Sequence, residues 1–252
     1  MSDQVLAGKL AVITGGSSGI GFAAAELLGA AGATVVVLGA TTESGQAAAE
    51  LLVKEGIDAV GEGADVSNAD EMDQLAERLG ALAQPDIVVA SAGVMSDRMS
   101  KTLKTTPQEW QRVIDINLTG VWNTVRVFSK SLVERRSGRV ITVSACLGRF
   151  TGPGTAGGLA PYRVSKAAVN ALTRNFAAET GWGDRGVLVD AMCPNHSRTR
   201  MGGPDAPRSA REGADTIYWL AVSDLAARAD QVGPHEFPLT GLLWEDRQIV
   251  PF

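Results

Sequence analysis

Short runs of β-branched and aliphatic residues alternate along the chain with longer stretches whose apolar positions recur at helical spacing. The short runs predict strands at 9–14, 34–39, 58–66, 86–93, 138–145, 187–194 and 240–246. The stretches between them predict helices, including a long one over 106–136 and another that begins near Pro161. Strand–helix alternation favours right-handed parallel crossovers and a sheet covered on both faces. We therefore expect an α/β fold with a doubly wound, mostly parallel seven-stranded sheet.

The bulk composition agrees with a globular domain and excludes several classes of partner. The chain has 252 residues, 45% hydrophobic and 20% charged, with a net charge of −5. No linker or repeat interrupts the alternation, so one domain is expected. Acidic and basic residues are interspersed without a basic stripe, so we expect neither a nucleic-acid nor a membrane partner. The polar N-terminus and the two cysteines, Cys146 and Cys193, favour a reduced, cytoplasmic protein.

The first predicted strand runs into a glycine-rich loop, TGGSSGIG, between Thr14 and Gly21. Gly15 permits a tight turn, Gly19 lets a pyrophosphate approach the backbone, and Gly21 allows close helix–strand packing. The loop opens a predicted helix, whose free N–H groups and dipole favour an anion. A glycine trio alone also serves plain turns, but this strand–loop–helix setting favours a dinucleotide.

A tyrosine and a lysine lie one helical turn apart in PYRVSK, at Tyr162 and Lys166. Residues four apart on any helix are neighbours, so a surface pair or a core tyrosine is the simpler interpretation. The chemical interpretation is a proton donor, because a nearby ammonium favours the phenolate and lowers the pKa of about 10 that free tyrosine has. Reduction of a carbonyl needs such a proton beside the hydride that a nicotinamide carries.

These motifs resemble the short-chain dehydrogenase/reductase family, with its Thr-Gly-x-x-x-Gly-x-Gly loop and Tyr-x-x-x-Lys pair. The likeness extends to Asp65-Val66, Ala92-Gly93, Asn117, Ser144, and the Cys-Pro-Asn segment that ends in Asn195. It implies a single-domain Rossmann fold over 1–252 with a substrate lid around 195–215. It implies a catalytic set of Asn117, Ser144, Tyr162 and Lys166, in which Ser144 binds the substrate oxygen and Asn117 positions a water.

The cofactor is expected to be NADP(H) rather than NAD(H). An acid after the second strand would bind a ribose hydroxyl and repel a phosphate, but Gly39, Ala40 and Thr41 stand there. The loop and the resemblance together assign the cofactor contacts to Gly15, Ser17, Ser18, Gly19, Ile20, Gly21, Ala40, Thr41, Asp65, Val66, Ala92, Gly93, Tyr162, Lys166, Pro194 and Thr199.

Several features depart from the family pattern. Asn195 replaces a glycine, which a positive φ would tolerate, and His196 either touches substrate or is a solvated loop residue. The arginines of the lid either attract an acidic substrate or form salt bridges. Cys146 and Cys193 are interpreted as buried thiols, and no metal site is expected.

The function that follows is reduction of a ketone or aldehyde, or oxidation of a secondary alcohol, by an enzyme nearest the carbonyl-reductase branch. A non-catalytic dinucleotide-binding regulator and a nicotinamide-using epimerase or dehydratase remain alternatives. Two helices, 107–135 and 161–180, resemble those through which many family members associate. A homodimer or homotetramer is therefore possible, whereas the carbonyl-reductase likeness favours a monomer.

Overall fold

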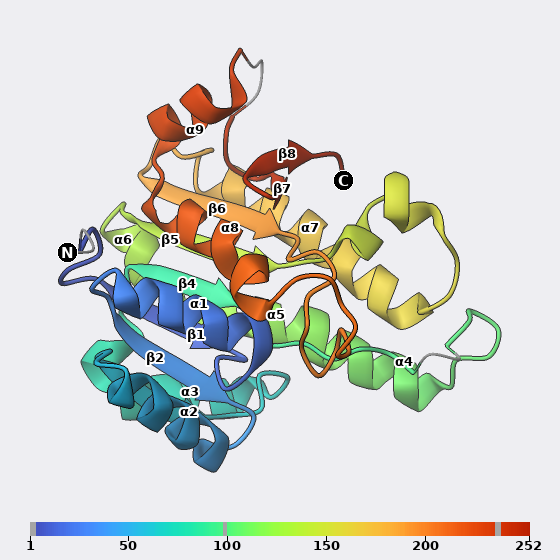
Figure 1. The fold of residues 1–252 in the computed structure, drawn as a ribbon, viewed down its shortest axis with the longest axis horizontal. Helices are drawn as coiled ribbons and strands as arrows, with labels where there is room; N and C mark the ends of the chain where they lie inside the picture. Colours follow the sequence, from blue (N-terminus) through green and yellow to red (C-terminus); the bar gives the residue numbers. More distant parts are fainter. Residues whose placement is uncertain (1–3, 98–99, 235–237) are drawn as a thin grey trace.

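The computed structural model describes residues 4–97, 100–234 and 238–252 and shows one twisted sheet with helices on both faces (Figure 1). The sheet has eight strands in the order β3-β2-β1-β4-β5-β6-β7-β8. Their bounds are β1 Leu10–Thr14, β2 Thr34–Gly39, β3 Ala59–Gly63, β4 Ile87–Ala90, β5 Gly138–Val143, β6 Val187–Met192, β7 Leu243–Glu245 and β8 Gln248–Val250. The doubly wound α/β fold is confirmed.

The strand count differs from the predicted seven because the chain turns back at its end. Strands β1 to β7 pair in parallel, whereas β8 pairs antiparallel with β7. Asp246 and Arg247 between them both have positive φ, at 52° and 61°. This is the backbone that a two-residue hairpin turn requires. The hairpin forms one edge of the sheet and also contacts the segment 195–215.

The helices are α1 Gly19–Ala30, α2 Thr42–Lys54, α3 Ala69–Leu79, α4 Pro107–Ile114, α5 Gly120–Phe128, α6 Lys130–Glu134, α7 Ala160–Glu179, α8 Ala210–Val222 and α9 Leu225–Val232. The helix predicted over 106–136 is therefore not a single α-helix. A π-helical turn, Asp115–Thr119, joins α4 to α5, and Ser129 separates α5 from α6. Such π turns occur often at functional sites, and this one contains Asn117.

Alternating strand residues divide the core into two layers. Ile13, Val37 and Val89 face a cluster with α1, α2 and α8, while Val12 and Val88 face a cluster with α3, α5, α6 and α7. Both faces of the parallel strands are therefore buried, which explains their continuous apolar sequence. Among the residues that the structure describes, no helix is long and apolar enough to cross a membrane.

The order of the strands places the site. The chain builds β2 and β3 on one side of β1 and then continues with β4 on the other. Loops that leave β1 and β4 at their carboxyl ends therefore diverge and open a crevice, where ligands bind in sheets of this kind. The glycine loop leaves β1 at this point, and Ala92-Gly93 follows β4.

Candidate active site

The glycine loop is packed so tightly against the end of β4 that side chains are excluded. Gly15 has φ of 65°, and a Cβ there would lie 2.8 Å from the Ala92 Cα. A Cβ on Gly21 would lie 2.8 Å from the Gly15 carbonyl carbon. Both contacts are with backbone, which cannot rotate away, so glycine is required at these two positions. The roles inferred from the spacing of Gly15 and Gly21 agree with this packing.

The N-terminus of α1 is left open toward the crevice. Ser18 is its N-cap but makes no side-chain capping hydrogen bond, and the first turn carries no acidic residue. Free N–H groups and the helix dipole therefore remain available to an anion. From the opposite side, Arg200 donates a 3.2 Å hydrogen bond to the Ser18 hydroxyl, and Thr199 lies 3.2 Å from the place of a Gly19 Cβ. These features fit the pyrophosphate of a dinucleotide.

The loops after β2 and β3 flank the place expected for the adenosine. Ala40 and Thr41 are exposed, and Thr41 caps α2 by accepting a hydrogen bond from the Ser44 amide. Asp65 is exposed and accepts hydrogen bonds from Ser67, whereas Val66 is buried in the core. No acidic side chain follows β2 directly, so the residues present are compatible with a 2′-phosphate.

Tyr162 and Lys166 are both buried on α7, beside the carboxyl end of β5. The Lys166 Nζ donates a 2.7 Å hydrogen bond to the Val143 carbonyl and lies 5.9 Å from the centre of the Tyr162 ring. The sequence placed the two residues on one helical face, and the structure confirms that they are neighbours in the core rather than on the surface. A buried phenol beside a buried ammonium is an arrangement that proton transfer can use.

The electrostatics of this pair differ from the expectation. Burial raises the pKa of the Tyr162 hydroxyl, and nearby Cys193 and Cys146 add to the rise. Burial also lowers the pKa of Lys166 to about 8. The predicted lowering of the tyrosine pKa by Lys166 is therefore not found, because burial moves it in the opposite direction. Tyr162 stays protonated at neutral pH, as a proton donor must, and the pKa of Lys166 lies only a little above neutral pH.

Asn117 and Gly93 line the same place. Asn117 is fully buried in the π turn, where its side-chain oxygen accepts from the Val94 amide at 2.7 Å and its nitrogen donates to the Val94 carbonyl at 2.9 Å. A Cβ on Gly93 would lie 3.3 Å from the Asn117 oxygen and 3.5 Å from the Lys166 nitrogen. Asn117 thus fixes the strand-like segment after β4 against α7, next to Lys166.

Ser144 does not take the position expected of it. Its hydroxyl is buried and donates a 3.2 Å hydrogen bond to the backbone carbonyl of Lys166. The next residue, Ala145, has an extended backbone, so its side chain points the opposite way. Ala145 packs in the buried cluster of Tyr162 and Val113. The side chain that β5 presents to Tyr162 is therefore a methyl group, and the Ser144 hydroxyl instead holds α7 against the strand.

Comparison with known proteins identifies the family. A family model described as short chain dehydrogenase matches residues 9–209. The chain belongs to the short-chain dehydrogenase family. A 3-oxoacyl-[acyl-carrier-protein] reductase from Synechocystis sp. is 37% identical over 198 residues, which cover 78% of this chain and 77% of the relative. A galactitol 2-dehydrogenase from Rhizobium johnstonii is 35% identical, covering 78% and 74%.

Solved structures of this family superpose on nearly the whole chain. One is a candidate NAD(P)-dependent gluconate 5-dehydrogenase from Beutenbergia cavernae with NADP bound at low occupancy, at a TM-score of 0.81 and 28% identity over 97% of each chain. Another is a short-chain dehydrogenase/reductase from Mycobacterium marinum, with a TM-score of 0.81 and 26% identity over 97% of this chain and 96% of that one. The Rossmann-like fold and the oxidoreductase family are confirmed.

In this short-chain dehydrogenase the segment after β6 has the backbone that the sequence allowed. Asn195 has φ of 57°, so it takes the place of a glycine without the strain of a larger residue. The exposed His196 ring bonds to the Gly202 carbonyl at 2.8 Å, within its own loop. Pro194 accepts a 2.8 Å hydrogen bond from Ser197, which fixes the turn that leads to Thr199. This geometry favours His196 as a loop residue over a substrate contact.

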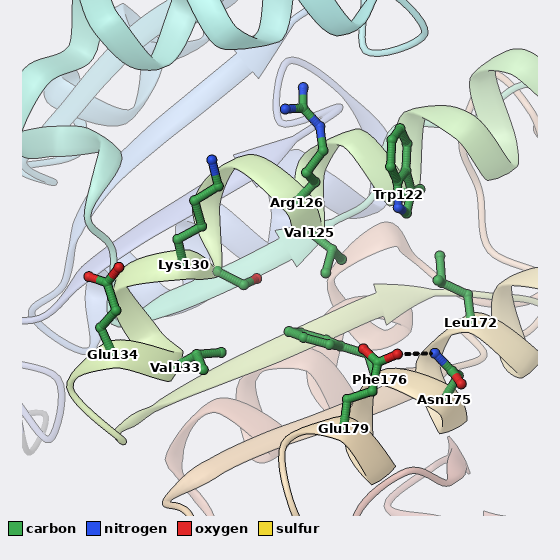
Figure 2. A pocket seen from close by; sticks show the side chains of 11 residues that line it. Trp122, Val125, Arg126, Lys130, Val133, Glu134, Leu172, Asn175, Phe176 and Glu179 are labelled. Atoms are coloured by element: carbon green, nitrogen blue, oxygen red, sulfur yellow. Dashed lines mark hydrogen bonds between the residues drawn. The ribbon is translucent and has the colours of Figure 1, made fainter.

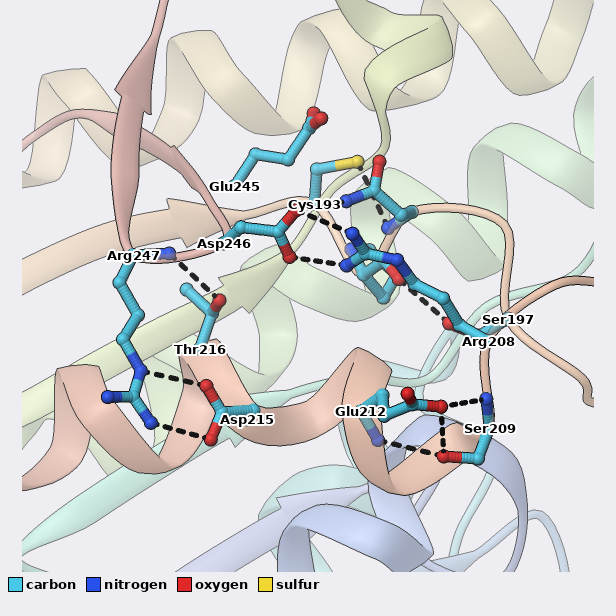
Figure 3. Close-up of polar contacts among 12 residues, drawn as sticks. Cys193, Ser197, Arg208, Ser209, Glu212, Asp215, Thr216, Glu245, Asp246 and Arg247 are labelled. Carbon is cyan, nitrogen blue, oxygen red and sulfur yellow. Dashed lines mark hydrogen bonds and ion pairs between the residues drawn. The ribbon is translucent and has the colours of Figure 1, made fainter.

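Two salt bridges and a side-chain hydrogen bond hold the lid segment 195–215 against the C-terminal hairpin. Figure 3 shows Arg208 facing Asp246, with one contact at 2.6 Å, and Arg247 facing Asp215 at 2.7 Å. Asp246 also accepts a 3.3 Å hydrogen bond from Asn195. Within the lid, Arg208 is thereby committed to a carboxylate of the protein, which favours a salt bridge over an anion-attracting role for this arginine.

The loop between β5 and α7 is organised by a residue that the sequence did not single out. The Arg163 side chain donates to the carbonyls of Gly158 at 2.9 Å and of Pro153 and Gly154 at 3.2 Å. These hydrogen bonds hold the 149–159 loop beside the cluster of side chains that contains Tyr162. The signal available in the sequence was its position directly after Tyr162, on a helix that starts within a glycine-rich loop.

Proposed function

We propose that the protein is an NADP(H)-dependent oxidoreductase that interconverts a ketone or aldehyde and the corresponding alcohol, with Tyr162 as general acid and base. The observation that carries the proposal is the buried Tyr162–Lys166 pair at the carboxyl end of β5, next to an open glycine cradle. The bound nicotinamide would supply or accept the hydride. The chain's own residues then have to bind, orient and move a proton.

Tyr162 is the group that gives its proton to the substrate oxygen. Its raised pKa keeps it protonated until a developing alkoxide, a much stronger base, draws the proton away. Lys166, held by the Val143 carbonyl, supplies the positive charge that stabilises the resulting phenolate. Asn117 keeps the backbone around Lys166 in place. We propose these three as the working set, and Ser144 as a positioning residue that fixes α7.

The surroundings of Tyr162 favour a substrate with an apolar group beside its carbonyl. Val113 and Ala145 pack on the ring, and Val94, Met95, Leu147 and Leu159 border the same cluster. Partly exposed apolar walls with one proton donor suit a ketone or aldehyde of low polarity. This agrees with the carbonyl-reductase branch of the family, to which we assign the protein in this proposal.

The preference for NADP(H) rests on the loop after β2 and on one relative. Ala40 and Thr41 present neither an acid nor a bulky side chain at the expected ribose position. The candidate gluconate dehydrogenase that shares the fold was solved with NADP. A 2′-phosphate here would meet hydroxyl groups without charge repulsion.

A panel of ketones, aldehydes and secondary alcohols, assayed with NADPH and with NADH at the nicotinamide absorbance, tests this function. We expect turnover of apolar ketones with NADPH and weaker turnover with NADH. Tight NADPH binding with no turnover across the panel would instead support a non-catalytic dinucleotide-binding role.

We further propose that the protein associates through α4–α6 and α7. Trp110, Trp122 and Val133 are exposed on α4–α6 although they are apolar. Figure 2 shows the adjoining hollow between α5–α6 and α7, about 480 Å³ in volume. Covering this face with a second copy would give the homodimer or homotetramer. Light scattering at micromolar concentration checks this: a monomer would contradict it, as would a dimer unaffected by Trp122→Glu.

A further inference from the structure

Two cysteines meet beside the catalytic pair. Cys146 begins the short 3₁₀ turn Cys146–Gly148 that follows β5, and Cys193 directly follows β6, the neighbouring strand. The amide of Cys146 donates a 2.9 Å hydrogen bond to the Cys193 sulfur, and the amide of Asn195 donates another at 3.4 Å. The Cys146 sulfur is separated from its own amide by only three bonds. Rotation of its side chain therefore sweeps close to the Cys193 sulfur.

The two thiols differ in exposure and in acidity. Cys193 is buried, with 2% of its surface exposed, whereas Cys146 is partly exposed. A hydrogen bond from the Cys193 thiol lowers the pKa of Cys146 below that of an ordinary cysteine, and the opposed charges of Arg149 and Glu245 act on it as well. Cys146 is therefore the more readily ionised thiol and, being partly exposed, is open to small oxidants, whereas the buried Cys193 is shielded. An accessible thiolate beside a protected second thiol is the arrangement of redox-sensitive cysteine pairs.

Both cysteines adjoin residues on which the site depends. Ala145, immediately before Cys146, packs against Tyr162. Asn195, two residues after Cys193, bonds to Asp246 of the C-terminal hairpin, and Figure 3 shows the Cys193 sulfur in this network. Both thiols also act electrostatically on Tyr162. Any covalent link between the sulfurs would therefore alter the surroundings of the proton donor from two sides.

We propose that Cys146 and Cys193 form a reversible intramolecular disulfide that switches the site off under oxidation by a peroxide. The Cys146 thiolate attacks a peroxide oxygen, the O–O bond breaks, and a sulfenic acid forms as hydroxide leaves. The Cys193 sulfur then attacks the sulfenic sulfur, its proton passes to the leaving oxygen, and water departs. One molecule of hydrogen peroxide is reduced to two of water while two thiols become one disulfide.

The geometry explains why the bond would inhibit. In a disulfide the two sulfurs lie about 2.05 Å apart, which is closer than in a thiol–thiol hydrogen bond. The two Cα atoms then lie about 4.4–6.8 Å apart. Closing it draws the 3₁₀ turn toward the end of β6 and shifts Ala145 against Tyr162. A misplacement of about 1 Å in a reacting group costs about a hundredfold in rate. Among the described residues no three His, Cys, Asp or Glu side chains gather around a metal position, so the pair has no evident ligand role.

The disulfide itself stands apart from the proposed function, and only its effect on turnover rests on that function. The test therefore reads the bond and the activity separately. The reduced full-length protein is treated with hydrogen peroxide, and the disulfide is followed by intact mass, by loss of titratable thiols and by peptide mapping. NADPH binding and turnover of an active ketone are measured on the same samples, before and after dithiothreitol.

We expect the wild type to lose the mass of two hydrogens and both thiols, to show a Cys146–Cys193 peptide, and to regain both thiols with dithiothreitol. Turnover should fall about tenfold to a hundredfold and recover on reduction. Cys193→Ala and Cys146→Ser should form no disulfide, and Cys146→Ser should keep its own untreated turnover after peroxide. In Cys193→Ala, the pH midpoint for alkylation of Cys146 should rise above its wild-type value toward the ordinary cysteine value of about 8.5.

Retention of both free thiols after peroxide, or oxidation of Cys146 to sulfinic acid without a disulfide in the wild type, would overturn the proposal. So would formation of the disulfide with turnover unchanged, because the link would then not be a switch. A protein that forms the reversible disulfide but turns over no substrate before treatment leaves the redox bond established and contradicts the oxidoreductase function instead.

Discussion

The loops that follow β1 and β5 both border the crevice but work by different means. After β1 the loop offers backbone: Gly15 and Gly21 exclude side chains, and the open end of α1 presents amide groups. After β5 the chain offers side chains, since Ser144 and Ala145 point to opposite sides and only Ala145 reaches Tyr162. A backbone site tolerates little change in packing, whereas a side-chain site changes its chemistry when the register shifts by one residue.

The difference explains where this chain departs from its family. The glycine loop has the motif and the packing expected of a dinucleotide cradle. Ser144 directly follows β5, but its hydroxyl bonds to α7 instead of facing the reacting group. Turnover should therefore depend steeply on Tyr162 and Lys166 of α7 and moderately on the residues after β5. The choice between NADPH and NADH should depend on the loop after β2.

The largest effect is expected from Lys166→Ala. Removing the ammonium should lower turnover by about 10³-fold or more, because the phenolate of Tyr162 then forms without a counter-charge. In the wild type, reduction should decline above the pKa of about 8 that burial gives Lys166, as the ammonium loses its proton. The decline should be absent in Lys166→Ala, and absent in Tyr162→Phe because that variant forms no phenolate for the ammonium to stabilise. Steady-state pH profiles measure this, with the exposed Lys54→Ala as control; a decline that survives in Lys166→Ala would contradict the assignment.

A smaller effect is expected from the residues after β5. Ser144→Ala should cost less than about tenfold in turnover, and about 1 kcal/mol of stability through the lost hydrogen bond to Lys166. Ala145→Ser places a hydroxyl beside Tyr162 and should raise turnover about tenfold, since a donor near the substrate oxygen stabilises developing charge. Steady-state kinetics and thermal melts of the two variants show whether each residue acts on turnover or on stability. A loss of a hundredfold or more in Ser144→Ala, with stability unchanged, would return Ser144 to the reacting set.

The change expected at the loop after β2 affects cofactor choice rather than turnover. Ala40→Asp should shift the ratio of NADPH to NADH affinity toward NADH by about tenfold, through repulsion of the 2′-phosphate. Ala40 is the suitable position because it is exposed, whereas a Cβ on Gly39 would lie 2.7 Å from the Gly45 amide and disturb α2. Calorimetric titration with both cofactors measures the shift. Equal affinities in the wild type would contradict the NADP(H) preference.

The fold was predictable because its signals are periodic and local. Apolar runs separated by helical stretches predicted the strands of the parallel sheet, and Thr106 and Pro107 correctly predicted the start of α4. The π turn at Asn117 was missed, since it depends on contacts made in the fold, such as the hydrogen bond from Asn117 to Ser165 on α7. The break at Ser129 was also missed. The eighth strand was missed because Asp246 is followed by Arg247, where a hairpin turn of this kind usually has glycine.

The candidate site was predictable as far as spacing determines it. Tyr162, Lys166 and the three loop glycines follow from separations within single elements. The direction of Ser144 depends on strand alternation: Thr142 bonds to Thr173 on α7, so Ser144, two residues on, shares that face. The alternation could be read from the sequence, whereas the face that meets α7 could not. The pKa of Tyr162 could not be read from it either, because burial and the two cysteines, brought together only by the fold, control it.

The most direct test of the account is single-turnover reduction by Tyr162→Phe, with cofactor affinity measured on the same protein. Phenylalanine keeps the ring packed on Ala145 and removes only the hydroxyl. The account predicts a fall in the rate of about 10²–10⁴, with NADPH affinity retained because the glycine loop and Lys166 remain. Tyr218→Phe, at the chain's other tyrosine, should leave both unchanged. Near-normal turnover in Tyr162→Phe would show that the proton comes from another group and would contradict the mechanism.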